Sequence, residues 1–397
     1  MDAERHSRVR AAMAKAGLDA LVCRLPENVL FLTGYWPLTG ISWVLFAQDG
    51  APTCVVPACE EAEAGEALAD LPGRHVALRT YPYGNLAAGD VNTAVVNALR
   101  EAARGRRLRR IGFEGSFDFV APPGNAAEPV TGSRVGEAIA ASVAGPRALR
   151  DATALLAGLR VRKTPAEANR IRRSNEIACI GLQAFRDAVA PGRTGLDLVA
   201  AVEAEVMRTG TGHGGARRVR AFAQVATGAE ETSRGWRPME ISTRRPLVHG
   251  DLALLELGVV ADGYWSDRTR VRAAGAPGAR EQEITAHVRA AQEAAVRAVR
   301  PGALASDVDA AARSVLEAAG LGKEFFHITG HGTGFRYHEP GSFLAPGSAV
   351  VLEEGMVFSV EPGVYSPGFG GVRLEDNVLV TAVGAEVLGP FAKELSG

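Results

Sequence analysis

The sequence predicts a two-domain protein, with a smaller α/β domain over residues 1–150 and an α+β domain over residues 151–397. Three observations support this prediction. A chain of 397 residues is too long for one comfortable core. In the first part, short apolar runs alternate with helical stretches. In the second part, pairs of long helices precede and follow strands that carry acidic residues.

The first domain is expected to begin with a helix and to continue with short strands. The spacing of Val9, Met13 and Ala16 predicts a helix over residues 5–16, which Gly17 ends. Further helices are expected near 60–70 and 90–103, and strands at Ala20–Cys23, Trp43–Phe46, Thr53–Val56 and Ile111–Glu114. Because this part has no cluster of acids and histidines, we expect a scaffold or specificity domain.

A helix start marks the second domain. Thr164, Pro165 and Glu167 supply an N-cap, a proline at the first helical position and a capping-box acid. We therefore place the domain boundary near residue 150. Helices are expected over 165–190, 195–209, 280–299 and 305–319, and Pro301–Gly302 stops the third of them.

Composition and charge narrow the class of protein. A content of 47% apolar and 22% charged residues is typical of a globular protein. The net charge of -1 predicts neither a nucleic acid nor a membrane as partner. The arginine-rich run 104–110 is interpreted as a solvated turn, because the aromatic residues that stack on single strands are missing. Four cysteines without a C-x-x-C pair predict reduced thiols, and the charged start Met1–His6 predicts no signal peptide, so we expect a cytoplasmic location.

Five residues that could bind metal occur where the pattern predicts buried strands or tight glycine turns: Glu256, Asp267, His331, Glu361 and Glu375. Glu256 lies inside an apolar run, and Glu361 ends another. Burying an ionised carboxylate alone is very costly, so something must offset that cost. Two divalent cations would neutralise the four carboxylates. The pattern is therefore that of a two-metal hydrolase.

Each of these residues also has a structural interpretation. Asp267 could be a turn or cap residue, whereas Glu256 inside an apolar run resists that explanation. A turn at Ala261–Gly263 would join their strands as a hairpin and bring both carboxylates to one metal pair. A lone histidine among glycines, such as His331, is more often structural, but as part of this set it is better explained as a metal ligand.

Neighbouring polar residues extend the set. His338 can reach a substrate from the loop that follows His331. Glu361 precedes Pro362–Gly363, so its backbone leaves the strand at a fixed kink. Period-two alternation puts Arg373 and Glu375 on one face, where Arg373 either neutralises the carboxylate or steadies a substrate. Oxygen-rich ligation with one imidazole favours two ions of manganese first, and otherwise cobalt, zinc or iron.

In this order, the motifs resemble those of the pita-bread metallopeptidase family, of the prolidase and aminopeptidase P type. The matching segments are Glu256–Arg270, Gly330–Pro340, Glu361–Tyr365 and Gly371–Asn377, with Leu32–Tyr35 and Arg162–Glu167 extending the likeness over the whole chain. The resemblance implies a pita-bread catalytic domain preceded by a smaller creatinase-like domain. It also implies a homodimer that hydrolyses the Xaa-Pro bond of dipeptides or short peptides.

The resemblance further implies a role for each residue. Asp267 and Glu375 would bridge two metal ions, His331 and Glu361 would hold one ion, and Glu256 would hold the other. Glu361 would also accept a proton. His338 would orient the scissile carbonyl or stabilise the tetrahedral intermediate. Residues expected beside the substrate are Arg373, Tyr365 and, as lid residues, Trp36 and Tyr35.

Two departures from the family pattern leave alternatives open. The first ligand is normally Asp, and Glu256 adds about 1.5 Å of reach, which predicts a displaced, monodentate or weakly held metal ion. A histidine expected in the stretch 233–238 is missing, and Trp236 or Arg237 takes its place. The alternatives are a relative with altered chemistry, such as a small cyclic or guanidino amide hydrolase or a lyase, and a catalytically silent binding protein.

Overall fold

The computed structural model describes residues 3–69, 76–83, 90–116, 134–237 and 242–396 of the chain. Its internal contacts divide the chain into two compact units, and the change from one to the other falls between Arg160 and Val161. This division lies close to the boundary near residue 150 that the sequence predicts. The two units are described separately below.

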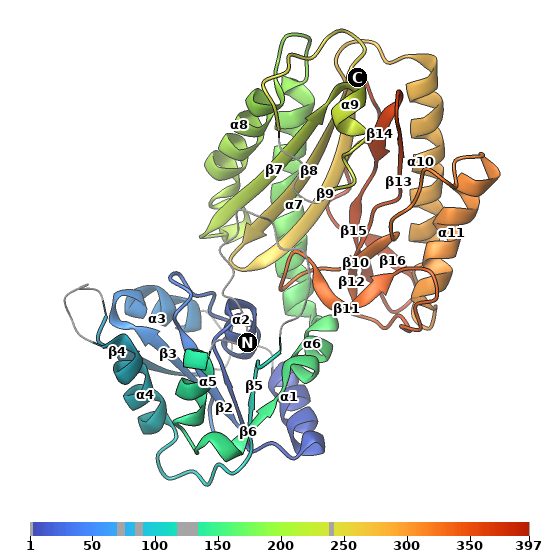
Figure 1. Cartoon of the computed structure of the whole chain (residues 1–397). Coiled ribbons are helices and arrows are strands. Elements are labelled where there is room, and N and C mark those ends of the chain that lie inside the picture. Colours follow the sequence, from blue (N-terminus) through green and yellow to red (C-terminus); the bar gives the residue numbers. More distant parts are fainter. Residues whose placement is uncertain (1–2, 70–75, 84–89, 117–133, 238–241, 397) are drawn as a thin grey trace. The chain divides into compact units, whose positions relative to one another are not determined.

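The first unit is built on one mixed six-stranded sheet with the strand order β4-β3-β2-β1-β5-β6 (Figure 1). Strand β1 (Ala20–Cys23) pairs antiparallel with β2 (Trp43–Ala47) and parallel with β5 (Ile111–Phe113). The other strands are β3 (Thr53–Pro57), β4 (Ala77–Tyr81) and β6 (Leu149–Asp151). Strands β1, β2 and β3 are buried throughout, which explains their continuous apolar sequence.

Helices cover this sheet. They are α1 (Ala3–Ala16), α2 (Pro26–Thr33), α3 (Glu61–Ala69), α4 (Val91–Ala102), α5 (Arg134–Ala141) and α6 (Thr153–Val161). Leu99 of α4 and Ile139 of α5 belong to the same buried cluster as Leu45 of β2. The loop after α2 is fastened by Glu60, whose carboxylate accepts hydrogen bonds from Tyr35 Oη at 2.6 Å and the Thr39 backbone at 2.8 Å.

The second unit contains three sheets. Strands β7 (Val219–Thr227), β8 (Leu252–Ala261) and β9 (Tyr264–Ala273) form an antiparallel sheet in that order. A five-stranded sheet has the order β11 (Glu339–Leu344), β10 (Gly330–Gly332), β12 (Val357–Val360), β15 (Asp376–Val380) and β16 (Ala385–Val387). Strands β13 (Gly363–Ser366) and β14 (Gly370–Arg373) form a separate antiparallel pair.

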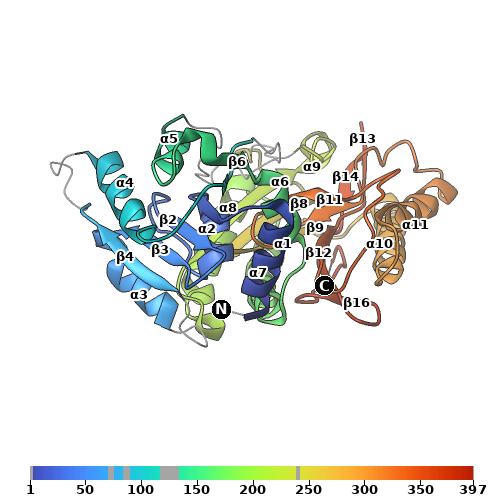
Figure 2. The same ribbon diagram turned by 90° about the horizontal axis from the view of Figure 1, so that it is seen from below.

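Two pairs of helices enclose these sheets. Helices α7 (Pro165–Ala188) and α8 (Gly195–Glu205) share a buried cluster with strands β7 and β8. Helices α10 (Ala279–Ala298) and α11 (Ala305–Ala318) lie side by side in both views (Figures 1 and 2) and pack on Phe358 and Val378. The short helix α9 (Gly228–Thr232) follows β7. The strands therefore lie between the helix pairs, as the sequence predicts.

The predicted elements of both units are confirmed with small shifts at their ends. Helix α7 begins with the predicted capping box, in which Glu167 Oε2 accepts from the Thr164 backbone at 2.8 Å. Helix α8 ends earlier than predicted, because the chain continues as a π-helical turn over Val206–Gly210. Helices α2, α5 and α6 and strands β4 and β6 were not predicted.

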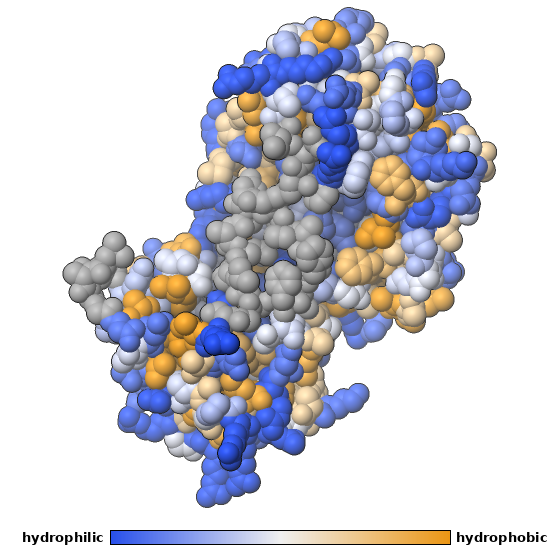
Figure 3. All heavy atoms as spheres, viewed as in Figure 1, coloured by the Kyte–Doolittle hydropathy of each residue, from blue (hydrophilic) through white to orange (hydrophobic). Residues whose placement is uncertain are grey.

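The surface and the helices agree with the composition. On the face drawn in Figure 3, hydrophilic and hydrophobic residues are interspersed over the described parts. Among the described residues, no helix combines the length and the apolar character needed to cross a lipid bilayer.

Candidate metal centre

The hairpin of β8 and β9 positions the first two carboxylates. Its two-residue turn, Asp262–Gly263, has positive φ at both residues, as a tight hairpin turn requires. The resulting register places Glu256 opposite Thr269 and Gly258 opposite Asp267. Because side chains alternate along a strand, Glu256, Asp267 and Thr269 share one face of the hairpin.

The remaining donors come from the strands that face this hairpin. His331 lies on β10, Glu361 follows β12, and Glu375 lies between β14 and β15. The Nε2 atom of His331 is 3.3 Å from Asp267 Oδ2 and 3.3 Å from Glu361 Oε1. Its Nδ1 atom lies 3.0 Å from the carbonyl oxygen of Gly332. A hydrogen bond from Nδ1 to this carbonyl turns Nε2 toward the carboxylates.

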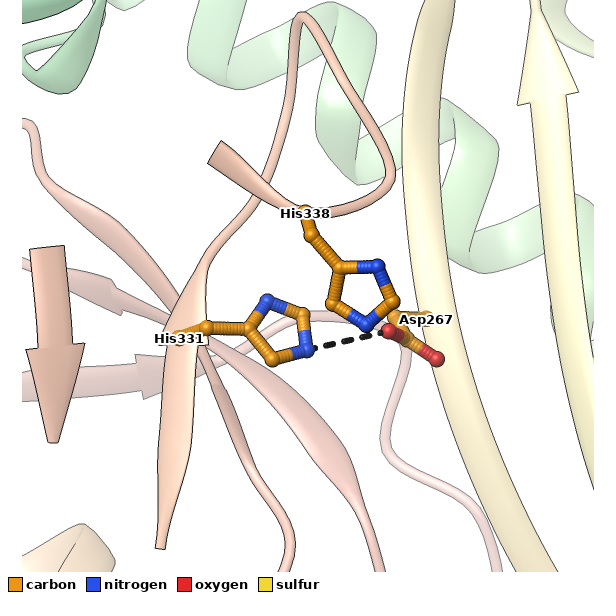
Figure 4. A group of neighbouring side chains, drawn as sticks. All are labelled: Asp267, His331 and His338. Carbon is orange, nitrogen blue, oxygen red and sulfur yellow. Dashed lines mark ion pairs between the residues drawn. The ribbon is translucent and has the colours of Figure 1, made fainter. Parts of the chain in front are cut away.

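The predicted donors form overlapping groups whose ligand atoms lie within 4.8 Å of one another. One group contains His331, Glu361 and Glu375, and another contains Glu256, Asp267 and Glu375. A third joins Asp267 and His331 to His338, as Figure 4 shows, and the two imidazole centroids are 4.1 Å apart. The structure thus brings all five predicted ligands and His338 together.

The electrostatics of the site favour a bound cation. Burial raises the pKa of Asp267 to about 7, and the charge of Glu256 adds to this increase. Burial also raises the pKa of Glu375 well above its usual range, helped by Asp267. Burial acts in the same direction on Glu361, but the hydrogen bond and charge of His331 outweigh it and lower that pKa to about 2. Crowded carboxylates of this kind are stabilised by a nearby positive charge.

Two buried carboxylate oxygens are available to bind a metal ion. Asp267 Oδ1 and Glu375 Oε1 are buried and have no hydrogen-bond partner within the described part of the chain. A buried acceptor without a partner is costly, and a cation would satisfy both atoms. The donor set of four carboxylates and one imidazole suits divalent metal ions with a preference for oxygen and nitrogen. The residues therefore fit the metal centre that the sequence predicts.

Arg373 connects the metal ligands with a buried tyrosine. Its guanidinium group forms an ion pair with Glu256 and lies 3.8 Å from Glu361 Oε2. It donates to the carbonyl oxygen of Gly235 at 2.7 Å and to Tyr365 Oη at 2.8 Å. Arg373 thus neutralises carboxylates of the centre, and its ion pairs in the described chain are with Glu256 and Glu361. Burial raises the pKa of Tyr365 to about 12.

The stretch without the expected histidine runs past this arginine. Trp236 is 42% exposed, and its ring meets that of Phe326 edge-on at 5.4 Å. Arg237 lies beside the Trp236 ring at 5.6 Å. Pro238, at the end of the stretch, is outside the described residues.

Four residues near the centre were missed in the sequence. Thr269 Oγ1 lies 2.7 Å from Glu375 Oε2 and 3.2 Å from Glu256 Oε2. Tyr337 donates to Glu256. His327 is half-buried, its ring is 5.5 Å from that of Tyr365, and desolvation of the imidazole lowers its pKa. Lys163 pairs with Glu339, the neighbour of His338, at 2.6 Å. Only the motifs around Lys163 and Thr269 could have signalled these contacts.

The remaining predicted substrate residue belongs to the other unit. Trp36 lies in the loop after α2 that Glu60 fastens, and it is half-buried. Its proposed place beside a substrate stays a prediction.

Family models place the chain among the metallopeptidases. Residues 169–382 match the model of metallopeptidase family M24, and residues 5–122 match the creatinase/prolidase N-terminal domain. The chain therefore belongs to metallopeptidase family M24. The expected fold, a creatinase-like α/β domain followed by a pita-bread catalytic domain, is confirmed.

Within this family the chain is similar to Xaa-Pro dipeptidases. It is 35% identical over 252 residues to the Xaa-Pro dipeptidase of Lactobacillus delbrueckii subsp. lactis, which covers 62% of this chain and 64% of that protein. It is 34% identical over 237 residues to the Xaa-Pro dipeptidase of Pyrococcus furiosus, covering 60% of this chain and 65% of the relative. These matches span slightly less than two thirds of each relative.

A solved structure matches over nearly the full length. The prolidase from Pyrococcus horikoshii OT3 superposes with a TM-score of 0.77 at 25% identity and covers 99% of both chains. The likeness therefore includes both units of the chain.

Proposed function

We propose that this chain is a metal-dependent peptidase that cleaves the Xaa-Pro bond of dipeptides or short peptides. The observation that carries the proposal is the convergence of Asp267, His331, Glu361 and Glu375 on one buried centre with two unpartnered carboxylate oxygens. The similarity to Xaa-Pro dipeptidases supports the choice of substrate. The same proposal includes two bound divalent ions, with manganese as the preferred metal. It also includes a homodimer and a role for Trp36 as a lid residue.

The reaction adds water to the scissile carbonyl and breaks the bond to the proline nitrogen. Bound divalent cations would activate the attacking water and polarise the carbonyl. Glu361 Oε1 faces His331 and the hydroxyl of Ser359, so Oε2 is the oxygen that accepts the proton of water. Glu361 then gives the proton to the proline nitrogen as the C–N bond breaks.

Two side chains would hold the substrate during this step. His338, beside His331, donates a hydrogen bond to the carbonyl oxygen that gains negative charge. Arg373 is held by Tyr365 and Gly235, so its guanidinium group is fixed where substrate meets the carboxylates. These roles of His338, Arg373 and Tyr365 are those that the resemblance implies.

The test compares substrates and one variant. Manganese-loaded protein should hydrolyse Ala-Pro or Ala-Pro-Pro, and the ratio of the two rates distinguishes a dipeptidase from an aminopeptidase. Ala-Ala serves as the control without proline. Glu361→Gln should lower kcat by about 10²- to 10⁴-fold, because it removes the proton acceptor. Absence of cleavage of every Xaa-Pro substrate by metal-loaded protein would refute the proposal.

A second candidate rests on Glu256. Because this residue is paired with Arg373, the centre differs from one in which all carboxylates face metal. A relative that hydrolyses a small cyclic or guanidino amide, or acts as a lyase, is the corresponding alternative. A panel of such substrates turned over faster than Ala-Pro would favour it.

A further inference from the structure

Glu256 differs from the other carboxylates of the centre because both of its oxygen atoms are already engaged. Oε1 accepts a hydrogen bond from the Tyr337 hydroxyl, and Oε2 forms an ion pair with Arg373. Thr269 Oγ1 lies 3.2 Å from Oε2 as well. The phenol of Tyr337 and the positive charge of Arg373 thus engage a side chain that the family pattern assigns to a metal ion.

Asp267 and Glu375, unlike Glu256, are not fully hydrogen-bonded. Each keeps one buried oxygen without a hydrogen-bond partner in the described residues. Ligand atoms of Glu256, Asp267 and Glu375 nevertheless lie within 4.8 Å of one another. The distances therefore permit an ion between the three carboxylates. The oxygen atoms that Glu256 would offer to that ion, however, already interact with Tyr337 and Arg373.

Tyr337 is held in this position by close packing. Its side chain is 5% exposed, and its ring meets Trp265 at 5.7 Å and His338 at 4.6 Å. A Cβ atom on Gly258 would lie 2.8 Å from the Tyr337 ring, so the glycine leaves the space that the ring fills. The phenol cannot simply swing away from Glu256. An ion entering there must take Glu256 from the phenol.

We propose that Tyr337 controls metal occupancy in this chain by competing with the second divalent ion for Glu256. One ion binds firmly to His331, Glu361, Glu375 and Asp267. The second ion binds weakly, because it must break the Tyr337–Glu256 hydrogen bond and approach the guanidinium group of Arg373. This inference rests on the metal-dependent function proposed above. It makes Tyr337 a positioning residue, since it acts through Glu256.

The test measures metal binding instead of turnover. Metal-free protein is titrated with Mn²⁺ in a calorimeter, and the bound metal is counted by elemental analysis. Wild type should bind one ion tightly and a second weakly. Tyr337→Phe should bind the second ion about tenfold or more tightly, as expected when one hydrogen bond to a charged group is removed. The ultraviolet absorbance of tyrosine should change at the second equivalent in wild type and not in Tyr337→Phe.

Two further variants keep the test decisive. Glu256→Asp draws the carboxylate away from the phenol and should also tighten the second site, which replaces Tyr337→Phe if that variant fails to fold. Tyr81→Phe is the matched control, because it removes a hydrogen bond from a buried tyrosine hydroxyl to the Ile41 carbonyl oxygen in the first unit. It should leave both affinities unchanged.

The possible outcomes separate this inference from the proposed function. If wild type binds two ions with equal affinity, the proposal that Tyr337 weakens the second site is overturned and the peptidase proposal is unaffected. An unchanged second affinity in both Tyr337→Phe and Glu256→Asp also overturns it. Failure of wild type to bind any divalent ion overturns both proposals.

Discussion

At the residue scale, Asp267 and Glu375 explain why this centre calls for a cation. Their side chains are almost fully buried, 1% and 0% exposed, and each retains an oxygen without a partner in the described chain. Without a metal ion, the cheapest way to relieve such a carboxylate is to bind a proton. Burial accordingly raises the pKa of both residues, so a metal ion that binds there competes with a proton.

The stability of the metal-free protein should therefore depend on Asp267. Its folded pKa of about 7 lies above the ordinary 3.8, so the folded chain holds this proton more tightly than the unfolded chain. The resulting stabilisation is complete below pH 3.8 and is lost as the pH rises through 7. In Asp267→Asn the side chain is a neutral amide at every pH, so this contribution to the pH dependence is absent. Urea unfolding of metal-free protein at pH 5 and pH 8 should show wild type losing on the order of a few kcal/mol relative to the variant.

Bound Mn²⁺ should reverse this difference in stability between wild type and Asp267→Asn at pH 8. Wild type gains stability from the bound ion, whereas Asp267→Asn lacks a ligand and gains less. An identical pH dependence of the two metal-free proteins would contradict the assignment of the raised pKa to Asp267.

Single residues differ in how far their sequence reveals them. Glu256 and Glu361 are recognisable because an acid inside or at the end of an apolar strand has no ordinary structural explanation. Tyr337 and His327 are not, because a tyrosine or histidine beside apolar residues suits any core. Their contacts with Glu256 and Tyr365 depend on which strands become neighbours, and the local pattern does not contain that information.

At the element scale, a buried ion pair connects the start of α7 with the loop of His338. Lys163 Nζ lies 2.6 Å from Glu339 Oε2, and the two side chains are 0% and 2% exposed. Glu339 Oε1 also accepts from the Phe335 backbone at 2.8 Å. The pair thus fixes the loop between β10 and β11.

Removing only the cation of this pair should be expensive. Lys163→Met leaves Glu339 buried with no opposite charge and should lower the free energy of unfolding by about 3–5 kcal/mol. The double variant Lys163→Met with Glu339→Gln should recover part of this loss, because no buried charge remains. Guanidinium unfolding curves measure both values. A double variant as unstable as the single one would show that packing, not charge, is what Lys163 supplies.

Periodicity explains which elements could be predicted. The amphipathic helices α7, α10 and α11 have one buried face and were found within a few residues. Helix α2 was missed because nearly all its residues are buried, which removes the helical pattern. Strand β4 was missed for the opposite reason, since most of its residues are exposed or half-buried at the edge of the sheet. The hairpin register that unites Glu256 with Thr269 follows from the Asp262–Gly263 turn.

At the scale of the whole molecule, the metal ligands join strands that are far apart in sequence. They come from the β8–β9 hairpin, from β10, and from the ends of β12 and β14, and all belong to the second unit. An ion bound by these residues links the three-stranded sheet with the five-stranded sheet. The free energy of binding is then added to the folding of the second unit.

Hydrogen exchange should locate this stabilisation. A ligand at 100 times its dissociation constant adds about 2.7 kcal/mol, which slows exchange through unfolding about a hundredfold. We expect Mn²⁺ to slow the exchange of β9, β10, β12 and β15 by this order, measured by mass spectrometry of peptic peptides. Strands β1, β2 and β3 of the first unit contribute no ligand to the groups that could hold metal in the described chain, so their exchange should not change.

His331→Ala supplies the control, because it removes the imidazole that both Asp267 and Glu361 contact while leaving the hairpin unaltered. Its exchange should be nearly independent of Mn²⁺. Equal protection of β1 to β3 and β9 to β12 in wild type would mean that the metal ion stabilises the two units as one cooperative body. Protection limited to the second unit would instead assign the folding energy of the metal ion to the sheets that carry its ligands.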